Sequence, residues 1–163
     1  MTKPDHDPRL TERRNPRTPA IDTASPLEIV DLITKEDASV PAIVAAARLE
    51  LARTIEFIEA SFRDGDRLVY VGAGTSGRLG VLDAAECPPT FGTDPAMVVG
   101  VIAGGPSALV RSAEGAEDDV AAGRAAMEEH RVSPRDTVVG IAASGTTPYV
   151  RAALERAHEI GAK

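Results

Sequence analysis

Three short apolar segments constrain the fold of this chain more than any other feature. They are rich in β-branched residues, apolar on both faces, and lie at 68–71, 97–102 and 137–141. Such segments are typical of buried strands in a parallel sheet. Helical patterns are found between and after them, at 76–85, 106–115, 117–130 and 148–160. This alternation predicts a doubly wound parallel α/β sheet with right-handed crossovers.

The residues before the first strand divide into two parts. Residues 1–20 hold four prolines among charges, so we expect an extended or disordered segment. Residues 21–65 favour helices: Ser25-Pro26 is typical of a helix start, and a short helix is predicted to run to about residue 35. Apolar residues at helical spacing then predict one long amphipathic helix over 41–63.

Composition and charge argue against several classes of protein. The net charge is −7, which disfavours binding to a nucleic-acid backbone. Cys87 is the only cysteine, so no intrachain disulfide and no cysteine-rich zinc site is expected. No apolar run approaches the roughly 18 residues of a membrane span, and Met1–Arg17 lacks the apolar region of a signal peptide. We therefore expect a cytoplasmic protein with neither a nucleic-acid nor a membrane partner.

The loop after the first strand, Val71 to Arg78, indicates an anion site. Its glycines allow a sharp turn and a close approach of the backbone to a ligand. Thr75 and Ser76 add hydroxyl groups at a predicted helix N-terminus, where free N–H groups favour a phosphate. We therefore interpret Gly74, Thr75 and Ser76 as a phosphate cradle.

Two alternatives remain open for the same loop. Gly72, Gly74 and Gly77 match the dinucleotide-binding pattern, but the second strand ends in Ala103-Gly104-Gly105 without the acidic residue that binds the ribose. Asp94 precedes that strand and so lies at the wrong end. The loop also lacks the Gly-Lys-Ser/Thr of a nucleoside triphosphate site, and a purely structural turn is the other alternative.

The third predicted strand ends in a second loop of this kind. Ser144, Gly145 and Thr146 follow it, and Pro148 begins the next helix. Ligands bind beyond the carboxyl ends of parallel strands, so we expect Ser144 and Thr146 to share one phosphate with the first loop. The alternative interpretation is a simple capped helix start.

Several motifs together resemble the N-acetylmuramic acid 6-phosphate etherases, and the resemblance covers nearly the whole chain. The two most specific blocks are Glu86-Cys87-Pro88-Pro89 and Glu114-Gly115-Ala116-Glu117-Asp118. The others are 11–15, 72–80, 102–105 and 140–145. The resemblance implies the sugar isomerase (SIS) fold, a sandwich around a five-stranded parallel sheet that binds phosphosugars. Residues 66–163 would then be an incomplete SIS domain, cut off after the third strand and the helix that follows.

The resemblance also implies an activity and a set of residues. The etherases are lyases of cell-wall amino-sugar recycling that remove the lactyl ether by elimination and hydration, giving N-acetylglucosamine 6-phosphate and D-lactate. Their two catalytic glutamates fall on Glu86 and Glu117. Phosphate contacts carry over to Thr75, Ser76, Ser144 and Thr146, although some relatives have Arg at the position of Thr146. The ligand would be a phosphorylated amino sugar, and no metal or cofactor is implied.

The chemistry needs two carboxyl groups. One must protonate the departing ether oxygen, and the other must take the proton from the carbon next to the open-chain aldehyde. The structural alternatives are a solvated helix-end carboxylate for Glu86 and a helix N-terminal charge for Glu117. Ser76 and Glu86 would lie about 15 Å apart on one unbroken helix. Either the chain bends back at Pro88-Pro89, or a second subunit supplies Glu86, which favours a homodimer with shared sites.

Two further functions remain open, and the length raises a separate expectation. A non-catalytic phosphosugar sensor would need neither glutamate, and a sugar-phosphate isomerase would not need the Glu-Cys-Pro-Pro block. Three strands make a thin sheet, and Gly161 is typical of a helix end after which another strand begins. We expect the 163-residue chain to be inactive by itself.

Overall fold

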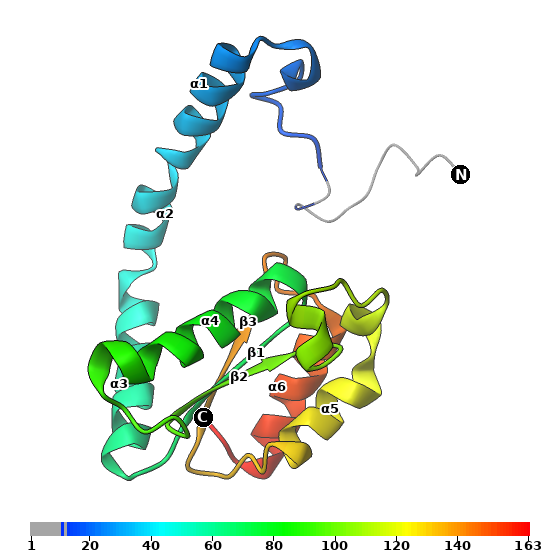
Figure 1. Ribbon diagram of the computed structural model, residues 1–163. Helices are drawn as coiled ribbons and strands as arrows, with labels where there is room; N and C mark the ends of the chain where they lie inside the picture. The colour runs from blue at the N-terminus through cyan, green and yellow to red at the C-terminus, as the bar shows by residue number, and fades with distance from the viewer. Residues whose placement is uncertain (1–10, 12) are drawn as a thin grey trace. The chain divides into compact units, whose positions relative to one another are not determined.

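The computed structural model describes residue 11 and residues 13–163 (Figure 1). It divides into two compact units, residues 1–54 and residues 55–163, and each unit is described separately below. Of the predicted N-terminal segment 1–20, residues 1–10 and 12 lie outside the described part.

The first unit is helical. A short 3₁₀ turn, η2 (Ile21–Thr23), precedes α1 (Pro26–Asp37) and α2 (Val40–Ala46). The predicted start of α1 is confirmed, because Ser25 and Glu28 form a capping box ahead of the helix. The Glu28 carboxylate accepts a hydrogen bond from the Ser25 amide at 2.8 Å.

The prediction of one continuous helix over 41–63 is wrong. The chain leaves helical geometry at Ala47, whose φ and ψ are −89° and 16°, and α3 (Arg48–Arg63) begins after it. The Ala47 amide bonds to the carbonyl of Val44, three residues earlier, which closes the last turn of α2 tightly. The apolar spacing continues through this break without a proline or glycine, so periodicity alone did not reveal it.

The second unit is built on a three-stranded sheet. The strands are β1 (Leu68–Gly72), β2 (Val98–Ile102) and β3 (Thr137–Ile141), in the order β2-β1-β3. Both pairings are parallel, so the predicted parallel α/β sheet is confirmed. The three runs are buried or nearly so on both faces, which is why an alternating pattern is absent from the sequence.

Helices cover both faces of this sheet. The helix α4 (Gly74–Phe91) packs on β1 and β2, while α6 (Pro148–Ile160) packs on β3 and β1 and against α5 (Val120–Glu129), which lies beside it (Figure 1). The predicted last helix and its stop are confirmed, because Gly161 adopts the left-handed conformation with φ of 97°. The core beneath α5 and α6 is aliphatic apart from Met127 and Tyr149, and includes Val69, Val71, Val101, Val138, Val150 and Ala153.

The two tyrosines of the chain lie on different faces of the sheet. Tyr70 of β1 packs against α4 near Gly80. Burial, followed by the interaction of its phenol with the Asp83 carboxylate, raises the pKa of Tyr70 to about 12. Tyr149 is only 3% exposed in the core beneath α5 and α6, and its burial raises its pKa as well.

Two helical predictions need correction in length. The region predicted as a helix over 106–115 contains only the 3₁₀ turn η3 (Pro106–Leu109), followed by an irregular loop. The helix predicted to end at residue 85 continues to Phe91, with Pro88 and Pro89 inside it. It stops at Gly92, whose left-handed φ of 68° and hydrogen bond to the Pro88 carbonyl close the last turn.

A buried ion pair joins the start of β1 to the turn before β3. The Arg67 guanidinium donates to both carboxylate oxygens of Asp136, at 3.1 and 2.7 Å, and also to the carbonyls of His130 and Arg131. Asp136 additionally accepts from the Ser133 amide at 2.9 Å, and its side chain is 2% exposed. This cluster fixes the amino ends of two neighbouring strands and so helps to set their register.

Candidate functional site

Three loops leave the sheet together at one edge. The strands end in register, because Gly72 of β1 is paired with Ile102 of β2 and Ile141 of β3. The order β2-β1-β3 means that the connections from β1 and from β2 run in opposite directions across the sheet. Ligands of doubly wound proteins bind at such a switch point, beyond the carboxyl ends of the strands. Five predicted residues follow β1 or β3 at this edge: Gly74, Thr75, Ser76, Ser144 and Thr146.

The helix α4 begins within the glycine loop, two residues earlier than predicted. Ala73 is extended, Gly74 has a positive φ of 54°, and no side chain caps the helix. A Cβ atom on Gly77 would lie 2.7 Å from the Gly72 carbonyl oxygen, so only glycine permits this packing of helix against strand. The uncapped N-terminus of α4 therefore lies directly at the sheet edge, where its N–H groups favour an anion.

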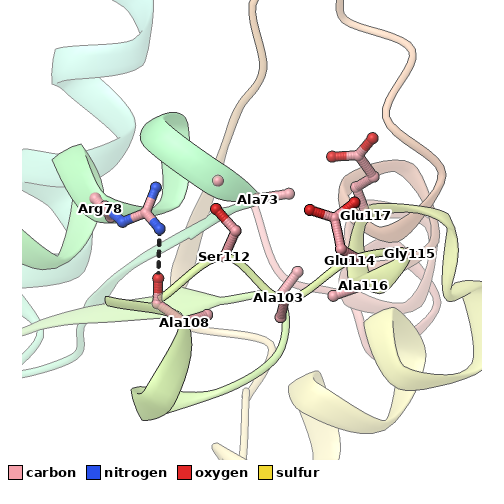
Figure 2. Close-up of a pocket in the computed structure, with 11 residues that line it drawn as sticks. Ala73, Arg78, Ala103, Ala108, Ser112, Glu114, Gly115, Ala116 and Glu117 are labelled. Atoms are coloured by element: carbon pink, nitrogen blue, oxygen red, sulfur yellow. Dashed lines mark hydrogen bonds between the residues drawn. The ribbon is translucent and has the colours of Figure 1, made fainter. Parts of the chain in front are cut away.

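A cavity of about 150 Å³ lies beside this helix start (Figure 2). Figure 2 shows Arg78 on one side of the cavity and the carboxyl groups of Glu114 and Glu117 on the opposite side. Most of the wall between them consists of small side chains. The lining residues are Ala73, Gly74, Arg78, Ala103, Ala108, Ser112, Ala113, Glu114, Gly115, Ala116 and Glu117.

Glu117 lies in the 3₁₀ turn η4 (Ala116–Asp118), just ahead of α5. Gly115 introduces this turn with a left-handed φ of 73°. The N-cap of α5 is Asp119, whose carboxylate accepts from the Ala122 amide at 2.8 Å. Asp119 and not Glu117 therefore caps α5, while Glu117 lines the cavity together with Gly74.

Arg78, Ser112 and Glu114 line the cavity but were not among the predicted site residues. Arg78 donates from Nε to the Leu109 carbonyl at 3.0 Å and from Nη2 to the Ala108 carbonyl at 2.7 Å. One signal for Arg78 was available, because it lies four residues after Gly74 and therefore on the same face of the helix. Glu114 begins the Glu114–Asp118 block, but no role was predicted for it, and Ser112 lies in a loop without periodicity, where the sequence offers no signal.

Glu86 is separated from this cavity. It is exposed in the middle of α4 and does not line the cavity. The proposed bend at Pro88-Pro89 is wrong, because α4 runs without interruption from Gly74 to Phe91. Ten residues of continuous helix place Ser76 and Glu86 about 15 Å apart along the helix axis.

The remaining predicted residues lie at the sheet edge outside the cavity lining. Thr75 is exposed and Ser76 is half-buried in the first turn of α4. In the loop after β3, the Ser144 hydroxyl oxygen accepts from the Thr146 amide at 3.1 Å and lies 2.9 Å from the Thr146 hydroxyl. Gly145 between them has a left-handed φ of 66°, so the loop is a tight turn with its hydroxyl groups paired to each other.

In residue 11 and residues 13–163, no group of three or more His, Cys, Asp or Glu side chains is placed to hold a metal ion. Within the same part of the chain, none of the helices combines the length and apolar character needed to span a membrane.

Comparison with known proteins gives two results. A family model described as the glucokinase regulatory protein N-terminal SIS domain matches residues 50–158. Proteins named N-acetylmuramic acid 6-phosphate etherase match 94% of the chain, with 54% identity for those of Glaesserella parasuis and Thermosynechococcus vestitus and 55% for that of Crocosphaera subtropica. The chain spans about half the length of these curated relatives, 50% in each case.

Proposed function

The chain belongs to the family of glucokinase regulatory protein N-terminal SIS domains, and on this premise we propose that the protein containing it is an N-acetylmuramic acid 6-phosphate etherase. The names of the relatives support this activity, and so does their identity over 94% of the chain. Because the chain spans half of those relatives, the proposal concerns the whole protein and not these 163 residues alone.

One observation supports the proposal most directly. Gly74, at the uncapped N-terminus of α4, and the carboxylate of Glu117 line the same cavity. A helix N-terminus suits the phosphate of a sugar phosphate, and a nearby carboxylate suits the removal of a proton from its sugar. This combination is what an elimination on a phosphorylated amino sugar requires.

In the proposed mechanism, Glu117 takes the proton from carbon 2 of the open-chain sugar, next to the aldehyde. The ether bond between carbon 3 and the lactyl oxygen breaks, a double bond forms between carbons 2 and 3, and Glu86 protonates the departing oxygen. Water then adds to carbon 3 with the help of Glu86, and a proton returns to carbon 2. The products are D-lactate and N-acetylglucosamine 6-phosphate, and the step requires only acid–base groups.

The direct test is release of D-lactate by the purified full-length protein from N-acetylmuramic acid 6-phosphate. We expect stoichiometric D-lactate and N-acetylglucosamine 6-phosphate.

The family description, which names a regulatory protein, favours a non-catalytic sensor as the second candidate. A sensor would bind the sugar phosphate without releasing D-lactate, and an isomerase would convert a sugar phosphate to its ketose instead.

We further propose that Glu86 acts in the site of a second copy of the chain. The unbroken helix separates Glu86 from the phosphate-binding end of α4 by about 15 Å, more than the length of a sugar phosphate. Leu79 and Leu82, earlier on the same helix, are 55% and 57% exposed, which suits an interface between subunits.

The cytoplasmic location expected from the sequence is also a part of the proposal.

Mixed dimers test this sharing of the site. In a shared arrangement, a dimer of one Glu86→Gln chain and one Glu117→Gln chain keeps one intact site of its two. Equal mixing after denaturation and refolding should therefore restore about one quarter of wild-type activity, since half of the dimers are mixed. Each variant refolded alone is the control, and a mixture as inactive as the separate variants would contradict the proposal.

The phosphate cradle makes a separate prediction. Ser76→Ala in the full-length protein should weaken binding of N-acetylglucosamine 6-phosphate by about 1–2 kcal/mol, the scale of one hydrogen bond to a charged group. Calorimetry measures this, with Thr90→Ala as a control because Thr90 is exposed near the far end of the same helix. Unchanged affinity in Ser76→Ala would count against the cradle.

A further inference from the structure

Of the described residues that line the cavity, Arg78 is the only one with a cationic side chain. The two other charged residues that line the cavity, Glu114 and Glu117, are both acidic and lie opposite to it (Figure 2). In the described part of the chain, Arg78 forms no ion pair with either of them, and its recorded partners are two backbone carbonyls. A positive charge thus faces the cavity without a carboxylate of the protein bound to it.

The guanidinium group of Arg78 is held in place by these carbonyls. At the end of η3, Nε donates one N–H to the Leu109 carbonyl and Nη2 donates one to the Ala108 carbonyl. A guanidinium carries five N–H groups, so three remain on Nη1 and Nη2. Figure 2 shows the second terminal nitrogen turned away from Ala108. The planar group is therefore oriented before a ligand arrives, which reduces the entropy lost on binding.

The proposed substrate carries two anionic groups with different needs. Its phosphate suits the N-terminus of α4 and the hydroxyl loops at the sheet edge. Its lactyl group ends in a carboxylate, which must enter and leave beside Glu114 and Glu117. Two carboxylates would repel that group in a small cavity unless a cation were close to it. Arg78 is the residue in the lining that supplies such a charge.

We propose that Arg78 binds the lactyl carboxylate of the substrate and thereby determines specificity for a sugar that carries this acid. The inference rests on the proposed function, since it names the group that the same site recognises. Arginine suits the task because its remaining N–H groups can meet both oxygens of a carboxylate. A phosphosugar without the acidic side chain would lose this contact while keeping its phosphate contacts.

The experiment changes both partners of the contact. Binding is measured by calorimetry in the full-length protein with Glu117→Gln, which prevents turnover. The ligands are N-acetylmuramic acid 6-phosphate, the same compound with its lactyl carboxylate converted to an amide, and N-acetylglucosamine 6-phosphate. Each is compared with Arg78 intact, with Arg78→Lys and with Arg78→Gln.

With Arg78 intact, we expect the amide to bind about 10- to 100-fold more weakly than the acid, as for loss of a charge-assisted contact. Arg78→Gln should bind the acid and the amide alike, with affinity for N-acetylglucosamine 6-phosphate changed by less than about twofold. Arg78→Lys should recover part of the preference for the acid over the amide, since lysine keeps the positive charge but lacks the planar guanidinium group. Arg156→Gln, which removes a surface cation paired with Glu128, is the control and should leave all three affinities unchanged.

Two results would overturn the proposal. The first is equal binding of acid and amide with Arg78 intact, which needs no substitution at Arg78 and so does not depend on the folding of Arg78→Gln. The second is an equal loss of affinity for all three ligands in Arg78→Gln, which would assign Arg78 to the phosphate or to the support of η3. Failure of the proposed function is separate, because the protein without substitutions would then release no D-lactate.

Discussion

In the full-length protein, Glu117→Gln is expected to lower kcat for D-lactate release by about 10³-fold, the scale of a lost general base. Glutamine keeps the size of the side chain but cannot accept the proton from carbon 2. The same variant should also fail to exchange deuterium at carbon 2 of the substrate with solvent. Glu86→Gln should still exchange it, because the first proton transfer precedes protonation of the leaving oxygen. Enzymatic D-lactate assay and mass spectrometry measure the two quantities.

A matched control lies beside Glu117. Asp118 belongs to the same 3₁₀ turn but does not line the cavity, so Asp118→Asn removes a similar charge at almost the same place. We expect it to change kcat by less than about threefold, since it makes no contact with the reacting atoms. Exchange at the normal rate in Glu117→Gln would show that another group is the base, and Glu114 would then be the first candidate.

The second large effect is on stability. Asp136→Ala should lower the free energy of unfolding by about 3–5 kcal/mol, because it leaves the Arg67 guanidinium without its carboxylate at the start of β1. The Ser133 amide would lose its acceptor as well. Urea unfolding followed by circular dichroism at pH 7 measures the change. Glu59→Ala breaks the exposed pair with Arg63 and should cost no more than about 1 kcal/mol.

The same cluster predicts how stability depends on pH. Burial of Asp136 acts to raise its pKa, but the hydrogen bonds and charge of Arg67 and the Ser133 amide outweigh burial and hold the pKa below its usual value. A lowered pKa in the folded state stabilises the fold fully above the unfolded value of about 4, and this contribution is lost as pH falls through the folded value. The difference between Asp136→Ala and the unsubstituted protein should therefore shrink at low pH. A difference that stays constant down to pH 2, or a loss at pH 7 no larger than that of Glu59→Ala, would contradict this account.

The strands were the part of the fold that the sequence determined most clearly. Each is a short β-branched run buried on both faces, so the ends of the strand coincide with the ends of the apolar segment in the sequence to within about one residue. Helix ends were harder where local signals conflicted. Pro88 and Pro89 normally stop a helix, yet α4 continues through them to Gly92. At Ala47 the reverse is true, because the helix ends there without a local signal in the sequence.

The site was predictable to the extent that it depends on topology. Parallel strands in register bring their following loops to one edge, so the approach of the loops after β1 and β3 could be expected from the strands alone. The cavity itself depends on the irregular path from Gly104 to Gly115, which carries no periodic pattern. That is why Ser112 and the position of Glu114 opposite Arg78 could not be predicted, while the glycine loop was found.

The placement of the two tyrosines has a practical consequence for spectroscopy. The chain contains Tyr70 and Tyr149 but no tryptophan, so its near-ultraviolet signal comes mainly from one ring on each side of the sheet. A raised phenol pKa in the folded state stabilises the fold below the unfolded value of about 10, and this contribution is lost as pH rises through the folded value. Ionisation of the phenols, read as the change in absorbance near 295 nm, therefore reports unfolding in alkali. Replacing either tyrosine by phenylalanine leaves a single phenol, which makes each helical layer separately observable without an added label.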